Sequence, residues 1–218
     1  MVLEAKTLIA TPNIIHIPTK RQMNKALKEY STGLAQLIIE WNYLHENLAK
    51  LFCRTIDTIN AAVPLAIWHS IRSDLVQRQI LRAAAEERYA HEKKTRDEII
   101  WLLDKIDHSL SGKRNDVIHS PISLVTNAIG TQISTPINTS NPRALSLKGK
   151  ELVKELVWYR DTAYVLRLYA RELHRALNPT AHRPWPDRPM LPSPGSRPPA
   201  KKKIMAKPRK EHSPRKKA

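Results

Sequence analysis

The sequence predicts an all-α protein: an up-and-down bundle of four to five helices with an irregular or β-hairpin insertion and a disordered basic C-terminal tail. Only five glycines occur in 218 residues, and Leu, Ile and Ala are abundant. This composition favours helices over a sheet with many turns. Apolar residues also recur at steps of three and four, which is the spacing of one helix face. A bundle buries such faces against each other most economically.

The first helix is predicted from Arg21 to about Thr58. The stripe that predicts it continues through Gly33, and Pro64 marks a break after it. It contains Met23, Leu27, Tyr30, Leu34, Leu37, Ile38, Trp41, Leu44, Leu48 and Leu51. Residues 1–19 precede it as an N-terminal extension.

A second helical region covers residues 65–90. Asp74 followed by Gln77 resembles a new helix start within it, so two short helices are predicted there. Ile80, Leu81 and Ala84 are expected to face inward.

The next helix is predicted to begin at Thr95, where "TRDE" has the form of a capping box. In that arrangement the Thr95 hydroxyl and the Glu98 carboxylate each satisfy a backbone N–H. Its apolar stripe is Ile99, Leu102, Leu103, Ile106 and Leu110. Gly112 is placed to end it in the left-handed conformation.

Residues 121–147 interrupt the helical pattern. Ser, Thr, Asn, Pro and Ile dominate there, with β-branched runs on both sides of Gly130, which predicts an irregular insertion with a small β-hairpin. The last helix is predicted from about Lys148 to Leu177, before Asn178 and Pro179. Residues 20–178 therefore form one helical domain with the insertion inside it.

The net charge of +17 is concentrated in a tail covering residues 179–218. This tail has 12 Lys and Arg against Asp187 and Glu211, and it holds ten of the 16 prolines. Such a composition buries too little apolar surface to offset the entropy of ordering, so the tail is predicted to be disordered. It is either a solubilising extension or an arm that binds nucleic-acid phosphates, and an anionic membrane surface is a weaker option. The phosphate contacts would come from Lys201, Lys202, Lys203, Lys207, Arg209, Lys210, Arg215, Lys216 and Lys217.

Several kinds of site lack their sequence signals. The single cysteine, Cys53, fits a reducing compartment, and its apolar neighbours indicate a buried thiol. The nine histidines form no zinc motif, and no glycine-rich phosphate loop or nucleophile elbow is present, so we expect no metal and no cofactor. No apolar run approaches a signal peptide or a membrane span, and we expect a soluble, cytoplasmic protein.

Some aromatic residues raise the question of ligand binding. Trp68 beside His69 could suggest base stacking, but a packed aromatic is the simpler interpretation. Trp41, Tyr159 and Tyr169 lie at helical spacing and are expected in the core.

Residues 111–124, "SGKRNDVIHSPISL", hold the candidate site. Arg114 and Asn115 are followed by His119, and Pro121 predicts that a helix begun at Arg114 is short. The run "RNDVIHS" resembles the signature of the HEPN superfamily, an arginine and a histidine separated by four to six residues. The segment "WNYLHENLAKLF" in the first helix is also similar to the first helix of HEPN domains.

The resemblance implies a helical bundle and a metal-independent ribonuclease. Arg114, Asn115 and His119 would be the catalytic residues, with His45 or Glu46 in support. A histidine exchanges protons near neutral pH, and a guanidinium stays charged and holds phosphate oxygens. HEPN domains pair two motifs in one cleft, so the resemblance implies a homodimer that acts on RNA. An antitoxin-like protein is a further expected partner.

Spacing alone leaves other interpretations open. On a regular helix Arg114 and His119 lie about 140° apart, so one chain presents the pair poorly unless Arg114 precedes the helix. Arg114 could instead pair with an acid while His119 caps or packs. The chain could also bind nucleic acid through its basic tail without cleaving it.

Overall fold

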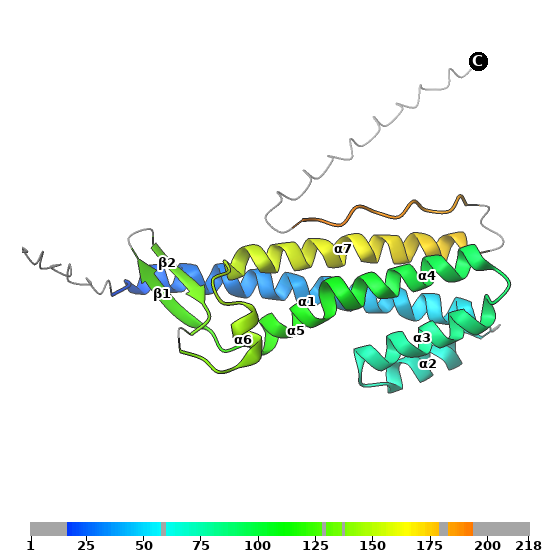
Figure 1. The fold of residues 1–218 in the computed structure, drawn as a ribbon, viewed down its shortest axis with the longest axis horizontal. Coiled ribbons are helices and arrows are strands. Elements are labelled where there is room, and N and C mark those ends of the chain that lie inside the picture. The colour runs from blue at the N-terminus through cyan, green and yellow to red at the C-terminus, as the bar shows by residue number, and fades with distance from the viewer. Residues whose placement is uncertain (1–16, 58–59, 128–129, 137, 179–182, 194–218) are drawn as a thin grey trace, which may run out of the picture.

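Two long helices that run parallel to each other form the spine of the molecule (Figure 1). The structure is a computed structural model that describes residues 17–57, 60–127, 130–136, 138–178 and 183–193. Helix α1 spans Lys20–Ile56 and helix α7 spans Leu152–Ala176. A capping box starts α1: the Thr19 hydroxyl accepts the Gln22 backbone N–H at 3.3 Å, and the Gln22 side chain accepts the Thr19 N–H at 2.8 Å. The two long predicted helices are confirmed.

At Gly33 the two helices of the spine lie close together. A Cβ added at Gly33 would lie 3.3 Å from the Cβ of Leu156 on α7, which is tighter than most packed contacts. The glycine thus permits a close approach of two helices that a larger residue would separate. Around this contact the core includes Leu37, Trp41, Leu44, Leu48, Tyr159, Leu166, Tyr169 and Leu173, each at most 3% exposed.

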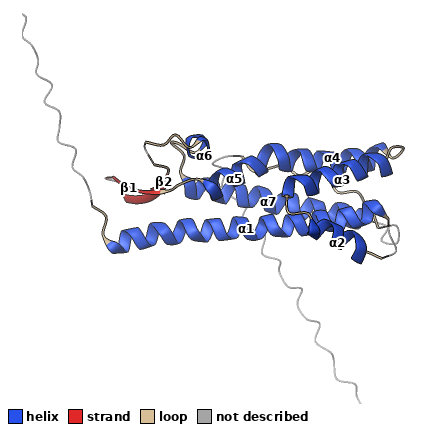
Figure 2. Ribbon diagram, turned by 90° about the horizontal axis from the view of Figure 1, so that it is seen from below, coloured by secondary structure: helices blue, strands red, loops and turns tan. Residues whose placement is uncertain are grey.

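Helices α2 (Ala62–Ser70) and α3 (Asp74–Arg88) lie beside the C-terminal half of α1 (Figure 2). The predicted division into two short helices is confirmed. The Ser73 side chain accepts the backbone N–H of Val76 and caps α3. Leu81 is fully buried, and Ile80 and Ala84 pack against the core at its edge.

Helix α4 (Lys93–Ile106) begins two residues before the predicted start at Thr95. Its N-cap is Glu92, and the Thr95 hydroxyl donates to the Glu92 carboxylate at 3.3 Å. Glu98 is unavailable for a capping box because Tyr169 and Arg188 both donate to its carboxylate. The expected capping box at Thr95 is therefore wrong, since tertiary partners compete for Glu98.

The predicted helix end at Gly112 is also wrong. The chain passes through one π-helical turn, Asp107–Ser111, directly into α5 (Gly112–His119). Gly112 has φ −61°, an ordinary right-handed value. Helix α5 ends at His119, as Pro121 predicts, because the residue before a proline avoids the helical conformation. Ser120 is accordingly extended, with φ −79° and ψ 141°.

The insertion contains the predicted hairpin. Strands β1 (Ser123–Asn127) and β2 (Gly130–Ser134) pair antiparallel, and Gly130 has φ 147°. The hairpin lies beside the N-terminal part of α1, where Ile133 is 4% exposed (Figure 1). A short helix, α6 (Pro142–Ser146), follows it. The all-α bundle with a hairpin insertion is the fold that the sequence predicts.

The boundary of the predicted disordered tail needs correction. Residues 183–193 form an extended segment along the bundle, and Trp185 and Leu191 pack against its core (Figure 1). Proline-rich chain has little conformational entropy to lose, and two large apolar side chains supply the buried surface. Residues 179–182 and 194–218 lie outside the described residues, and so do residues 1–16 of the N-terminal extension.

The expectations for individual side chains were mostly correct. Trp41, Trp68, Tyr159 and Tyr169 are buried in the core, as predicted. Cys53 is only half-buried, so its thiol is less enclosed than expected. Within the described ranges, the helices are too short or too polar to cross a membrane.

Candidate functional site

Arg114 and His119 both lie on α5, but the helix separates their side chains. Arg114 stands in the first turn after Gly112, within the helix rather than before it. Its side chain is 21% exposed, whereas His119 is exposed at the last helical residue. His119 lines neither of the two cavities described below. A single chain therefore does not bring the arginine and the histidine together.

The guanidinium of Arg114 is held between α1 and α3. It donates to the side chain of its neighbour Asn115 at 2.8 Å and lies 3.7 Å from the Asp74 carboxylate. It also lies 5.0 Å from the ring centroid of Trp41. Burial lowers the pKa of Arg114, and the Asp74 charge opposes that shift. Arg114 thus pairs with an acid, as the alternative interpretation supposed, while its charge remains beside open space.

That open space is a cavity of about 380 Å³ between α3 and the start of α5, which we call the arginine cavity. It is open to solvent, and its lining is mainly polar. The lining residues are Arg72, Ser73, Asp74, Leu75, Arg78, Ser111, Arg114 and Asn115. Three arginines against one aspartate give this lining a net positive charge, and guanidinium groups bind phosphate and carboxylate oxygens in pairs. The cavity has the chemistry of an anion site.

Arg78 is the buried member of this cavity, with 2% of its side chain exposed. Its Nε donates to Asp107 at 2.6 Å, and its Nη2 donates to Ser111 at 3.1 Å. Asp107 and Ser111 are the two ends of the π turn, so that turn supplies both partners. π turns inside helices often occur at functional sites. Here the turn fixes a buried guanidinium at the cavity wall.

His45 completes the hydrogen bonding of Arg78. Gln77 donates through its side-chain nitrogen to the carbonyls of Trp68 and Ile71, so its oxygen is left to accept a bond from His45 Nδ1 at 3.1 Å. His45 Nε2 then carries no hydrogen and faces Arg78 Nη1 at 3.5 Å. Burial lowers the pKa of His45, and the charges of Arg78 and Arg114 act in the same direction against Asp74 and Gln77. His45 is a neutral residue that positions Arg78.

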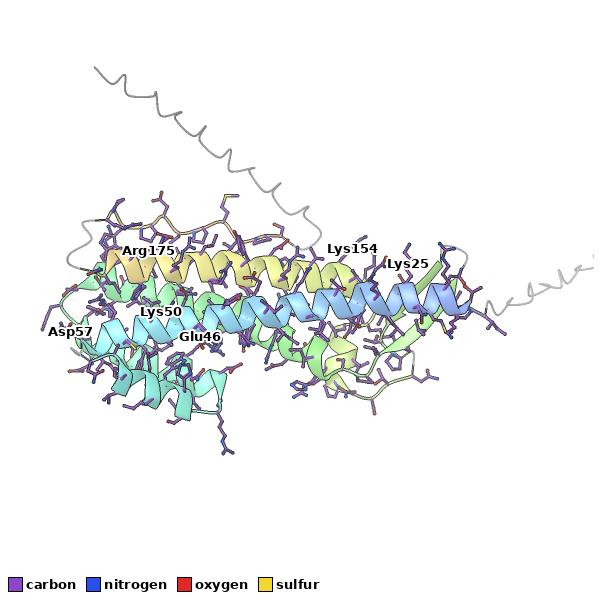
Figure 3. The ribbon with its side chains drawn as sticks, turned by 180° about the vertical axis from the view of Figure 1, so that it is seen from behind. Lys25, Glu46, Lys50, Asp57, Lys154 and Arg175 are labelled. Atoms are coloured by element: carbon purple, nitrogen blue, oxygen red, sulfur yellow. The ribbon has the colours of Figure 1, made fainter. Side chains whose placement is uncertain are left out.

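A second cavity, of about 300 Å³, adjoins the first and shares Asp74 and Arg114 with it. Both candidate supporting residues, His45 and Glu46, belong to its lining. Glu46 is exposed on α1, on the side where α2 and α3 lie (Figure 3). The full lining is Trp41, Asn42, His45, Glu46, Trp68, His69, Asp74, Gln77 and Arg114. The structure thus places His45, Glu46, Arg114 and Asn115 in one region, and it leaves His119 outside.

Sequence reasoning missed Arg72, Asp74 and Arg78 as site residues. The sequence pattern could have identified Arg78. It lies three residues before Leu81 and seven before Ala85, both fully buried on α3. A charged residue on the apolar face of a helix is expected to have a dedicated partner. Arg72 and Asp74 carried no such signal, because they lie at the turn between two helices.

Two further predictions concern the basic tail and metal binding. The basic residues between Lys201 and Lys217 lie outside the described residues. In the described part of the chain, no group of three or more His, Cys, Asp or Glu side chains could hold a metal ion.

Comparison with known protein families, with curated proteins and with solved structures finds no match to this chain.

Proposed function

We propose that this chain binds RNA in the arginine cavity and acts as a HEPN-like, metal-independent endoribonuclease. The observation that carries the proposal is the clustering of Arg72, Arg78 and Arg114 around one open cavity, with the motif residue Arg114 at its edge. The cavity is large enough for a phosphate group with its attached ribose. A phosphodiester is an anion that guanidinium groups bind well.

Cleavage would use the 2′-hydroxyl of RNA as the nucleophile on the adjacent phosphate. Arg114 would hold the phosphate oxygens as negative charge develops in the transition state. His119 would exchange the protons, because an imidazole can act as both general base and general acid. His45 is a poor candidate for this task, since burial lowers its pKa and both of its ring nitrogens face partners.

The position of His119 requires a second copy of the chain. It is exposed at the end of α5 and lines neither cavity of its own chain. A homodimer that faces α5 of one protomer with the arginine cavity of its partner would complete the site. An antitoxin-like partner that covers the cavity would inhibit it.

Binding without cleavage is the second candidate function. It is favoured by the same separation of Arg114 from His119, because the arginine cavity alone is sufficient to hold a phosphate. In this case RNA affinity depends on the arginines and the basic tail, and His119 has no role.

The test uses the purified full chain and a labelled single-stranded RNA, with EDTA present throughout. His119→Ala is expected to reduce the cleavage rate by about 10²–10⁴-fold, the usual contribution of a general acid or base. His91→Ala is the matched control, because His91 is also exposed but lies in the turn between α3 and α4. Cleavage that survives in His119→Ala, or that requires a metal, contradicts the ribonuclease proposal.

Arg114 is tested by binding as well as cleavage. Arg114→Ala should weaken RNA binding by about tenfold or more, since a charge-assisted hydrogen bond contributes roughly 1.5–3 kcal/mol. Arg114→Lys keeps the charge without the fork of donors and should restore part of the binding. Arg82→Ala is the control. Arg82 lies one helical turn after Arg78 on α3, and it pairs with Asp104 outside the arginine cavity. If Arg114→Ala binds RNA as Arg82→Ala does, the cavity is not the phosphate site.

A further inference from the structure

The second cavity differs from the arginine cavity in charge, and we call it the glutamate cavity. Its lining holds two carboxylates, Glu46 and Asp74, against the one guanidinium of Arg114. The arginine cavity has three arginines against Asp74 alone. Because Asp74 and Arg114 belong to both linings, a positive site and an acidic site adjoin at these two residues. A nucleotide has the matching polarity, since its phosphate is an anion and its base carries hydrogen-bond donors.

The buried part of the glutamate cavity has its polar groups paired within the chain. The indole N–H of Trp41 donates to Asp74 at 2.9 Å. The side-chain nitrogen of Gln77 donates to the carbonyl of Trp68 at 3.0 Å, and its oxygen is bonded to His45. Trp41 and Trp68 are at most 2% exposed. This inner wall is therefore fixed, and it supplies shape and apolar surface more than free hydrogen bonds.

Three side chains of the lining remain free for a ligand. Asn42 and Glu46 lie one turn apart on the same face of α1, and His69 lies near the end of α2. All three residues are exposed. Within the part of the chain that the structure describes, their side chains have no hydrogen-bond or ion-pair partner. The cavity thus presents an amide, a carboxylate and an aromatic ring to solvent beside its fixed wall.

This set of groups matches one nucleobase better than the others. A carboxylate only accepts hydrogen bonds, and guanine presents two adjacent donors, N1–H and the N2 amino group, on its Watson–Crick edge. Adenine and cytosine present an amino group beside an acceptor, and uracil presents one N–H between two carbonyls. The amide of Asn42 can donate to guanine O6, and the ring of His69 can stack on a base. The volume of about 300 Å³ is at the lower end of the range for small-ligand sites.

We infer that the glutamate cavity is a specificity pocket for a guanine of RNA, whose adjacent phosphate lies in the arginine cavity. This inference rests on the proposed function for RNA as the source of the guanine. Glu46 accepts from N1–H and the N2 amino group, so it selects the base and takes no part in proton transfer. Arg114, which lines both cavities, holds the phosphate beside the bound base.

The pocket is tested first with free nucleotides, by calorimetry on the purified full chain. GMP is expected to bind about tenfold tighter than AMP or more, as is usual for a bidentate contact to a base edge. Inosine monophosphate lacks the N2 amino group and should bind with intermediate affinity, because one of the two donors is lost. Equal affinities for the three nucleotides overturn the inference. If inorganic phosphate still binds in that case, the arginine cavity remains an anion site and the proposed function stands.

The role of Glu46 is tested by Glu46→Gln, a change of one acceptor atom at an exposed position. The ratio of the GMP and AMP affinities should fall to about one, while inorganic phosphate binds no more weakly. The ratio is the informative quantity, because loss of a negative charge favours all anionic nucleotides alike. Glu29→Gln is the control, since Glu29 is exposed on the same helix and lines neither cavity.

Two results with these variants contradict the assignment. One is a GMP preference that persists in Glu46→Gln, which would mean that another group selects the base. The other is tight binding of spermidine that competes with GMP and is lost in Glu46→Gln, which would make the cavity a cation site.

The source of the guanine is tested with two single-stranded RNA octamers that differ only in a central guanine or adenine. The wild-type chain should prefer the guanine octamer by the same factor as GMP, and Glu46→Gln should not. A preference for GMP with equal binding of the octamers would mean that the pocket takes a free nucleotide, and the inference about RNA would be wrong. If the guanine octamer is preferred but no RNA is cleaved, the pocket stands and the ribonuclease proposal fails.

Discussion

Replacing Asp107 by alanine should be among the most destabilising single changes at the polar face of the bundle. Asp107 accepts from Arg78 at 2.6 Å, and the Arg78 side chain is only 2% exposed. Removing the carboxylate leaves a guanidinium buried between α1, α3 and the π turn without its counterion. A buried charge that loses its partner is penalised much more than an exposed one.

The expected cost follows from the remaining contacts of Arg78. Breaking a buried ion pair typically costs about 3–5 kcal/mol. Asp107 is itself 30% exposed, so water can enter where the carboxylate was, and Ser111 and His45 still face the guanidinium. We therefore expect a loss of about 2–3 kcal/mol in the free energy of unfolding. A domain of this size has roughly 5–15 kcal/mol in total.

The assay is urea unfolding, with Asp104→Ala as the matched control. Asp104 pairs with Arg82 at the same distance of 2.6 Å, three residues earlier in the chain. That pair is 29% exposed at the arginine and 46% at the aspartate, so its loss should cost less than about 1 kcal/mol.

Two results would refute this reasoning. One is an Asp107→Ala variant no less stable than Asp104→Ala, which would mean that burial does not control the cost. The other is a failure of Arg78→Met with Asp107→Leu to recover stability. This pair removes both charges and fills the space with apolar groups, which for other buried pairs is neutral or stabilising.

Two further predictions concern pH and the helix glycines. Burial lowers the pKa of His45, so the folded chain binds fewer protons than the unfolded chain below about pH 6.5, and stability should fall as the pH drops. His45→Gln should flatten this dependence only in part, because burial also lowers the pKa of His174. In thermal melts, Gly112→Ala should stabilise the chain by about 1 kcal/mol, since an added Cβ meets nothing within 4 Å. Gly33→Leu should instead destabilise by about 1–3 kcal/mol, because its side chain would overlap Leu156. Equal effects of the two glycine substitutions, or a pH dependence unchanged in His45→Gln, would contradict these assignments.

The sequence predicted the helices whose apolar stripes are long. α1 and α7 were predicted to within a few residues, because burial of Leu37, Leu44, Tyr159 and Leu166 follows from their 3.6-residue period alone. The hairpin was predicted for a similar reason, since β-branched residues on both sides of Gly130 allow few other local structures. These are short-range signals, and the tertiary structure did not alter them.

The candidate site was only half predictable. Arg114, Asn115, His45 and Glu46 were chosen from a motif and a helix segment, and the fold brings all four to adjoining cavities. The expected partner of Arg114, His119, does not join them, because α5 stays helical through both residues and turns their side chains apart. The motif could not show this, since spacing does not fix where a helix begins.

By itself, the sequence determined the all-helical class, the course of the long helices and the concentration of positive charge at residues 179–218, since each depends on composition or local period. At three places the tertiary structure differs from what the local sequence pattern predicts, and only the structure could show this. The chain stays helical past Gly112 into α5, and the π turn before Gly112 supplies both partners of Arg78. The capping role expected of Glu98 is lost to Tyr169 and Arg188. Residues 183–193 lie along the bundle because Trp185 and Leu191 pack against its core and Arg188 donates to Glu98 on α4. In each case a partner far along the chain contributed more free energy than the local preference, and a local pattern carries no information about such a partner.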